Sequence, residues 1–274
     1  MKTILITGID GTGKSTLLNL IENSSLGANS AFLRLPLIEL KNLQKHTILY
    51  NTACFVNELG IYADKNKSVA LKAIALFSAM LLFKDLQSVE EKNYPSIVFC
   101  ERHPLIDTVV YAEFYAEKLA QKPQKEALNE NFSTKYCAEI EYLLQKLPVG
   151  YVNEKTSFFT FIQFIIVWFF QEKKTDFPSL EKLFGVTVPD KIFYLTASAE
   201  ILYKRVNNRE LKEAHETPET FKIMSKIYDT IFEKLNTEMP NFVTYMNTNN
   251  LDEIKTHLQT IEKECKTIII QPSK

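Results

Sequence analysis

The sequence predicts an α/β protein of three layers, in which helices cover both faces of a parallel sheet of about five strands. Short apolar runs recur along the 274-residue chain, and runs without polar alternation are typical of strands buried on both faces of a parallel sheet. Longer segments with helical periodicity separate these runs. That order of elements builds parallel sheets whose strands are joined by helices.

Five apolar runs are expected to form the strands. They cover residues 3–7, 31–35, 97–100, 191–196 and 242–246. Pro36 ends the second run, because proline has no amide N–H to continue a strand ladder. The isoleucine run 268–270 is a candidate for a short final strand.

The segments between the runs carry helical patterns. Helices are expected over residues 13–23, 38–64 with interruptions, 66–92, 105–121, 133–147, 198–207, 217–236 and 251–265. Residues 158–170 are densely aromatic and aliphatic. A buried helix, or a strand followed by a helix, is expected there, with an oligomer interface as the alternative. The segment is short for a bilayer span and contains Gln163.

Composition limits the functional classes. Apolar residues make up 46% of the chain and the net charge is −1, which allows a large core and disfavours nucleic-acid and membrane partners. The four cysteines show neither metal nor redox spacing, so reduced thiols in a cytoplasmic protein are expected. The first predicted strand begins at residue 3, so no signal peptide is expected.

A glycine-rich loop follows the first predicted strand. Residues 8–15 read Gly-Ile-Asp-Gly-Thr-Gly-Lys-Ser, which matches the G-x-x-x-x-G-K-[ST] pattern of a phosphate-binding P-loop. Glycines let backbone amides converge on a phosphate, the lysine bridges the β- and γ-phosphates, and the serine hydroxyl holds Mg²⁺. We expect ATP and Mg²⁺ to bind here, at Gly8, Asp10, Gly11, Thr12, Gly13, Lys14, Ser15 and Thr16.

Charged side chains follow two of the other predicted strands. Glu101 and Arg102 come directly after the run 97–100, where a carboxylate is well placed to hold Mg²⁺ through water. The metal site is therefore predicted at Ser15 and Glu101. Only four of the 32 basic residues are arginine, and arginine suits phosphate recognition better than lysine does. Besides Arg102 these are Arg34, Arg205 and Arg209.

These motifs resemble those of the thymidylate kinase family over about residues 1–112 and 188–265. Residues 8–16 are similar to its P-loop, including Asp10, which in that family contacts the acceptor sugar. Glu101-Arg102-His103 resembles its Asp-Arg-Tyr/His, and Arg205 with Arg209 resembles its LID arginines. The resemblance implies a P-loop kinase fold in which Lys14, Arg102, Arg205 and Arg209 are catalytic.

The resemblance is incomplete on the acceptor side. Arg34-Leu35-Pro36 lacks the glutamate of the family's Arg-Glu-Pro. The segment 76–80 ends in Met80 where the family has a phosphate-binding arginine, and Tyr111 lies near the family's tyrosine. The acceptor residues implied are Asp10, Arg34, Phe77, Met80, Arg102 and Tyr111. Residues 115–187 exceed the family's length, so we expect one kinase domain over 1–274 with a helical insertion there.

Three functions stay open. The first is phosphoryl transfer to thymidylate (dTMP + ATP to dTDP + ADP), and the second is a kinase for a deoxynucleoside or another small molecule, which Met80 and Glu101 favour. The third is nucleotide binding with little turnover. The chain has no Asn-Lys-x-Asp motif, which disfavours a GTPase. The family commonly forms dimers, so a homodimer is expected, and His103 is expected to be packed or solvent-facing.

Overall fold

The computed structural model describes all residues except 94, 122–133, 151–157, 209–215 and 271–274. The chain divides into two compact units. The sheet unit comprises residues 1–33, 90–102 and 189–274, and the helical unit comprises residues 34–89 and 103–188. Each is described separately below. That the whole chain forms one kinase domain with an insertion at 115–187 stays a prediction.

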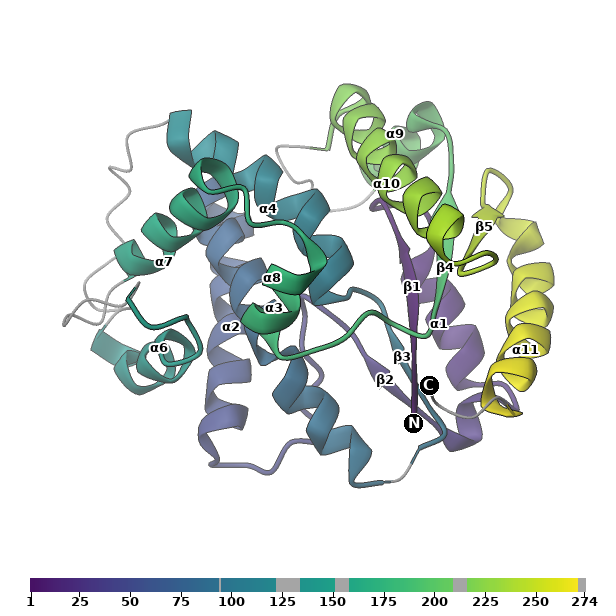
Figure 1. Cartoon of the computed structure of the whole chain (residues 1–274), viewed down its shortest axis with the longest axis horizontal. Coiled ribbons are helices and arrows are strands. Elements are labelled where there is room, and N and C mark those ends of the chain that lie inside the picture. The colour runs from purple at the N-terminus through teal and green to yellow at the C-terminus, as the bar shows by residue number, and fades with distance from the viewer. Residues whose placement is uncertain (94, 122–133, 151–157, 209–215, 271–274) are drawn as a thin grey trace. The chain divides into compact units, whose positions relative to one another are not determined.

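The sheet unit contains a five-stranded parallel sheet, which confirms the predicted fold class (Figure 1). Its strands lie in the order β2-β3-β1-β4-β5, and all four neighbouring pairs are parallel. The strands are β1 (Lys2–Gly8), β2 (Ser30–Leu33), β3 (Ile97–Cys100), β4 (Lys191–Thr196) and β5 (Val243–Asn247). Since β1 lies at the centre, the loop after it begins at the carboxyl edge of the sheet.

Helices α1 (Lys14–Glu22) and α11 (Ile254–Ile270) pack on one face of this sheet. Their apolar side chains form one core cluster with those of β1, β3, β4 and β5. Helix α10 (Pro218–Glu238) packs on the other face, where the Tyr228 and Phe232 rings lie 5.2 and 4.8 Å from the Tyr194 ring of β4. The sheet unit alone therefore has three layers. The helix α9 (Ala199–Asn207) contacts α10.

The last helix corrects one prediction. The run 268–270 is not a strand, because α11 continues through it to Ile270. The cause is helical spacing: Ile254, Leu258, Ile261 and Cys265 precede Ile268 at intervals of three and four residues, and all five side chains pack at the core cluster. Burial of this stripe outweighs the preference of isoleucine for strands.

The helical unit contains six α-helices in its described residues. These are α2 (Ile48–Asn66), α3 (Val69–Glu91, whose last residues belong to the sheet unit), α4 (Pro104–Gln121), α6 (Cys137–Leu144), α7 (Phe158–Ile165) and α8 (Phe177–Phe184). A π-helix, η2 (Ile166–Gln171), continues α7. The Phe77 ring of α3 packs against those of Phe164, Phe169 and Phe184 at 5.5, 5.8 and 6.0 Å.

The structure tests two sequence-based predictions in this unit. Residues 38–47 are not helical, because α2 begins only after Thr47, whose side chain accepts the Tyr50 amide. Before it, the Asn57 side chain pairs with both the N–H and the C=O of Ile38, at 2.8 Å each. Residues 158–170 are helical, and Phe164 and Phe169 are buried. None of the described helices is long and apolar enough to cross a membrane.

Candidate active site

The P-loop links β1 to α1 and depends on its glycines. Gly8 and Gly13 have φ of 152° and 94°, values that side chains with a Cβ rarely adopt. A Cβ on Gly8 would also collide with the carbonyl oxygen of Leu195. Thr12 tightens the turn, since its hydroxyl donates to the Ile9 carbonyl at 2.8 Å and its amide to the same oxygen at 3.2 Å.

Lys14 folds back over this loop. Its ammonium donates to the carbonyls of Gly8 and Ile9, at 2.9 and 3.2 Å, and to Asp10 Oδ1 at 3.2 Å. The side chain is only 5% exposed. The loop therefore holds a buried cation beside its own carbonyls at the start of α1, and a lysine in this place is typical of loops that bind phosphates.

Asp10 joins this cation to a second one. Its Oδ1 also accepts from Nη2 of Arg102, at 3.0 Å. Arg102 lies directly beyond β3, and β3 pairs with β1 in the sheet. The loop residue and the strand-end arginine meet because neighbouring parallel strands end at the same edge. The predicted residues Asp10, Lys14 and Arg102 are thus brought together.

The predicted metal pair also meets. The Ser15 hydroxyl donates to Oε1 of Glu101 at 3.1 Å. A hydroxyl and a carboxylate are the hard oxygen ligands that Mg²⁺ prefers, and Mg²⁺ usually keeps several waters beside one or two protein ligands and the substrate phosphates. The pair therefore fits that ion. The described residues contain no group of three or more His, Cys, Asp or Glu side chains that would form a metal site without a nucleotide.

Among the residues that the structure describes, Arg205 on α9 donates hydrogen bonds to backbone carbonyls only. Its guanidinium donates to the carbonyls of Gly11 at 3.2 Å, of Thr248 at 2.7 Å and of Asn249 at 3.1 Å. It therefore joins the P-loop to the segment after β5, and burial lowers the pKa of Arg205. These carbonyl partners could not be identified from side-chain identity. Thr16 is exposed on α1, and Arg209 lies outside the described residues.

The remaining predicted residues belong to the helical unit. Arg34 forms an ion pair with Glu39, which also pairs with Lys41 at 2.9 Å. Burial acts to raise the pKa of Glu39, but the hydrogen bonds from Lys41 and Arg34 hold that pKa below its usual value. The structure thus gives Arg34 an anionic partner within its own unit.

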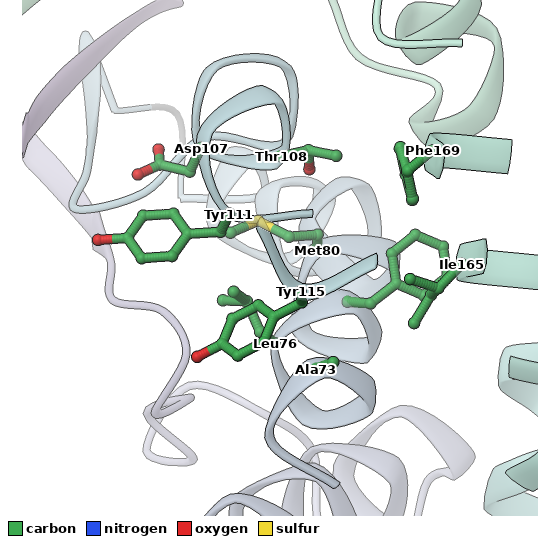
Figure 2. A pocket seen from close by; sticks show the side chains of 10 residues that line it. Ala73, Leu76, Met80, Asp107, Thr108, Tyr111, Tyr115, Ile165 and Phe169 are labelled. Carbon is green, nitrogen blue, oxygen red and sulfur yellow. The ribbon is translucent and has the colours of Figure 1, made fainter. Parts of the chain in front are cut away.

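Phe77, Met80 and Tyr111 line one pocket, between α3 and α4 (Figure 2). Seven further lining residues were not predicted from the sequence: Asp107, Thr108, Phe169, Ala73, Leu76, Tyr115 and Ile165. The polar pair 107–108 on an otherwise apolar helix face was the signal available for the first two. Nothing in the sequence linked Phe169 to this pocket.

His103 is packed and not exposed. Its Nδ1 accepts the amide N–H of Leu105 at 3.3 Å, and its own amide donates to Oδ2 of Asp107 at 2.7 Å. The ring therefore caps the first turn of α4. Burial lowers the pKa of His103 to about 3, so the neutral ring that accepts this bond persists at physiological pH.

Comparison with protein-family models gives no match for the chain, and comparison with curated proteins also gives none. Solved structures do match. A thymidylate kinase from Candida albicans superposes with a TM-score of 0.51 at 15% identity, over 97% of this chain and 93% of that one. A deoxyadenosine kinase from M. mycoides with bound dATP gives 0.51 at 17%, over 97% and 100%.

A second structure of that deoxyadenosine kinase, with the products dCMP and dCDP, gives a TM-score of 0.50 at 17% identity, over 97% and 99% of the two chains. At these identities the likeness concerns the fold. The chain has the α/β fold of P-loop nucleoside and nucleotide kinases, as the resemblance of its motifs predicts.

Proposed function

We propose that this protein transfers the γ-phosphoryl group of ATP to a nucleoside or nucleotide acceptor. The observation that carries the proposal is the cluster at the P-loop. There Asp10 joins Lys14 to Arg102, and Ser15 contacts Glu101. Phosphoryl transfer needs positioning and neutralisation of charge more than covalent chemistry, and this cluster supplies cations, amides and metal ligands in one place.

Each residue has a role in this proposal. The loop amides and Lys14 bind the β- and γ-phosphates, and Arg102 bridges the acceptor and the transferring group. Ser15 and Glu101, the latter through water, hold Mg²⁺, which when bound neutralises charge on the phosphates. Asp10 orients the acceptor sugar. Arg205 and Arg209 neutralise charge from the LID segment.

Different parts of the sequence favour two different classes of acceptor. Thymidylate is the acceptor that the motif resemblance favours, and one structural neighbour is a thymidylate kinase. An unphosphorylated nucleoside is the second candidate. It is favoured by Met80, which stands where the family has a phosphate-binding arginine, and another neighbour is a deoxyadenosine kinase. A cytoplasmic homodimer stays a prediction.

The test is release of ADP, measured with a coupled assay on the full chain with ATP, Mg²⁺ and a panel of nucleosides and monophosphates. Lys14→Ala should lower kcat at least a hundredfold while far-UV circular dichroism stays native. Lys263→Ala, at an exposed position on α11, is the matched control and should leave kcat unchanged. Near-normal turnover by Lys14→Ala would refute the P-loop mechanism. ATP binding without turnover of any acceptor would leave a nucleotide-binding protein.

A further inference from the structure

One carboxylate oxygen at the P-loop accepts hydrogen bonds from two cations. Oδ1 of Asp10 accepts from Nζ of Lys14 at 3.2 Å and from Nη2 of Arg102 at 3.0 Å. All three residues belong to the sheet unit, so this contact lies within one compact unit. The side chains of Lys14 and Arg102 are only 5% and 7% exposed, whereas that of Asp10 is 25% exposed. Two buried cations thus share one partly exposed anion.

The shared carboxylate offsets the repulsion between these cations. Two nitrogens that contact the same atom lie close together, and like charges that are removed from water repel each other strongly. Removing one partner of a buried ion pair is destabilising, because it leaves a charge without compensation. Asp10 therefore keeps Lys14 and Arg102 side by side at the P-loop.

All three N–H groups of the Lys14 ammonium are engaged. A lysine ammonium has three N–H donors, and that of Lys14 donates to the carbonyls of Gly8 and Ile9 as well as to Asp10. An oxygen of the γ-phosphate can therefore bond to this ammonium only in place of one of these three acceptors. Which acceptor gives way determines how ATP binding changes the loop.

Asp10 is the acceptor that gives way most easily. The Gly8 carbonyl ends β1, which pairs with β4, and the Ile9 carbonyl also accepts from the amide and the hydroxyl of Thr12. Both carbonyls are neutral and are fixed in the backbone. The Asp10 carboxylate ends a rotatable side chain, and its negative charge is repelled by a phosphate. Because Arg102 also binds the transferring group in the proposed function, both contacts of Asp10 oppose ATP binding.

We propose that Asp10 is a positioning residue that holds Lys14 and Arg102 together and releases both to the γ-phosphate of ATP. This role is additional to the contact with the acceptor sugar, and it rests on the proposed function because it concerns the nucleotide of that reaction. Phosphate oxygens accept charge-assisted hydrogen bonds from both cations, which compensate for the lost contacts. The carboxylate of Asp10 therefore stabilises the loop and at the same time weakens ATP binding.

The first experiment measures the Kd of ATP by titration calorimetry on the full chain with Mg²⁺. Asp10→Asn keeps the size of the side chain and removes its charge. We expect the Kd of ATP to fall about three- to tenfold, the combined size of two partly exposed ion pairs. Glu238→Gln removes one negative charge from an exposed position on α10 and should leave this Kd unchanged. An unchanged or higher Kd in Asp10→Asn would refute the role of Asp10.

Thermal unfolding separates this role from a purely structural one. Without ATP, Asp10→Asn should unfold at a lower temperature than the wild-type chain, because the two buried cations lose their counter-ion. The same saturating concentration of ATP should raise the unfolding temperature of the variant by more, since a more tightly bound ligand stabilises the fold more. A residue that only supports the fold would leave the increase caused by ATP equal in the two proteins, and that result would contradict the proposal.

The third experiment tests whether the effect depends on Arg102. In an Arg102→Met background one of the two cations is absent, so Asp10→Asn should lower the Kd of ATP by a smaller factor than it does in the wild-type chain. An equal factor in both backgrounds would show that Asp10 does not act through Arg102.

If Asp10→Asn fails to fold, the wild-type chain provides the test. In a crystal structure with a non-hydrolysable ATP analogue, we expect Oδ1 of Asp10 to lie beyond about 4 Å, the limit of an ion pair, from the charged nitrogens of Lys14 and Arg102. Retention of both contacts beside the bound γ-phosphate would overturn the proposal.

Failure of this role and failure of the proposed function give different results. Turnover of an acceptor by the wild-type chain, combined with weaker ATP binding by Asp10→Asn, would refute the role of Asp10 and leave the proposed function intact. Tighter ATP binding by Asp10→Asn, combined with no turnover of any acceptor by the wild-type chain, would support the role of Asp10 and refute the proposed function.

Discussion

Replacing Arg205 by methionine removes the three hydrogen bonds that join the P-loop to the segment after β5. The acceptors are the carbonyls of Gly11, Thr248 and Asn249, at 3.2, 2.7 and 3.1 Å. Methionine keeps the length and much of the apolar stem, so its main effect is the loss of the guanidinium. The variant therefore separates two roles for Arg205: holding two loops together, and stabilising charge during phosphoryl transfer.

The expected loss of stability follows from those contacts. A net hydrogen bond contributes about 0.5–1.5 kcal/mol, and Arg205 is half-buried, which places each bond at the lower end. Three such bonds amount to about 1.5–3 kcal/mol of unfolding free energy. In a chain of this size 1 kcal/mol changes the unfolding temperature by about 2–4 °C, so a decrease of about 3–12 °C is expected.

The assay pairs thermal unfolding with steady-state kinetics. If Arg205 only holds the loops, Arg205→Met lowers the unfolding temperature, raises the KM of ATP and reduces kcat less than tenfold. If it also neutralises charge in the transfer, as proposed above, the lower unfolding temperature is accompanied by a loss of about a thousandfold in kcat. Lys204→Met changes an exposed neighbour on α9 and should change none of these quantities. A native unfolding temperature combined with a loss of about a thousandfold in kcat, the size expected for a transition-state arginine, would refute the positional role.

Three further predictions follow from other contacts. Ser15→Ala and Glu101→Gln should each raise the Mg²⁺ concentration that gives half-maximal ADP release. The double variant should raise this concentration little more than either single variant does, since the two side chains act as a pair. Additive effects would show that the two side chains act independently. The depressed pKa of His103, about 3, makes its neutral ring a source of stability that is complete above pH 6.5 and lost as the pH falls toward 3. His103→Asn should flatten the pH dependence of urea unfolding over that range, and an unchanged slope would contradict the cap. Ile268→Asp should lower the unfolding temperature more than Ile269→Asp, because Ile268 packs on the core and Ile269 is 43% exposed; equal effects would argue against the helical C-terminus.

The sheet could be predicted because the residues of each strand form a recognisable apolar run. Strands buried on both faces read as continuous apolar runs, and the observed β3 and β4 coincide with the predicted runs 97–100 and 191–196. The errors occurred where a local signal competed with packing. Three consecutive isoleucines favour a strand, but the stripe that includes Ile261 and Cys265 continues into Ile268 and keeps that segment helical. The helix predicted to begin at residue 38 begins only after Thr47, and the Asn57 amide, 19 residues further along the chain, pairs instead with the backbone N–H and C=O of Ile38.

The residues predicted to bind the phosphoryl donor could be identified from the sequence for a similar reason. Residues 8–15 are contiguous, and their partners Glu101 and Arg102 follow a recognisable strand, so the rule that parallel strands end at one edge was enough to bring them together. Arg205 was assigned to the LID segment from the motif resemblance, and that assignment stays a prediction. Its three carbonyl acceptors could not be foreseen, because every residue carries a carbonyl and no sequence distinguishes one from another.

The acceptor side has no such contiguity. The pocket that contains the predicted acceptor residues takes Met80 from α3, Thr108 from α4 and Phe169 from η2, three segments that only packing brings together. The sequence showed that Met80 replaces the arginine of the resembling family. It did not show which side chains surround Met80. The Thr108 hydroxyl in this pocket has no hydrogen-bond partner within the described part of the chain, and a pattern of residues cannot reveal which polar atoms the fold leaves without partners. A pattern of residues can therefore bring the predicted nucleotide-binding residues together, whereas the side chains of the α3–α4 pocket are identified only by the packing of three separate segments.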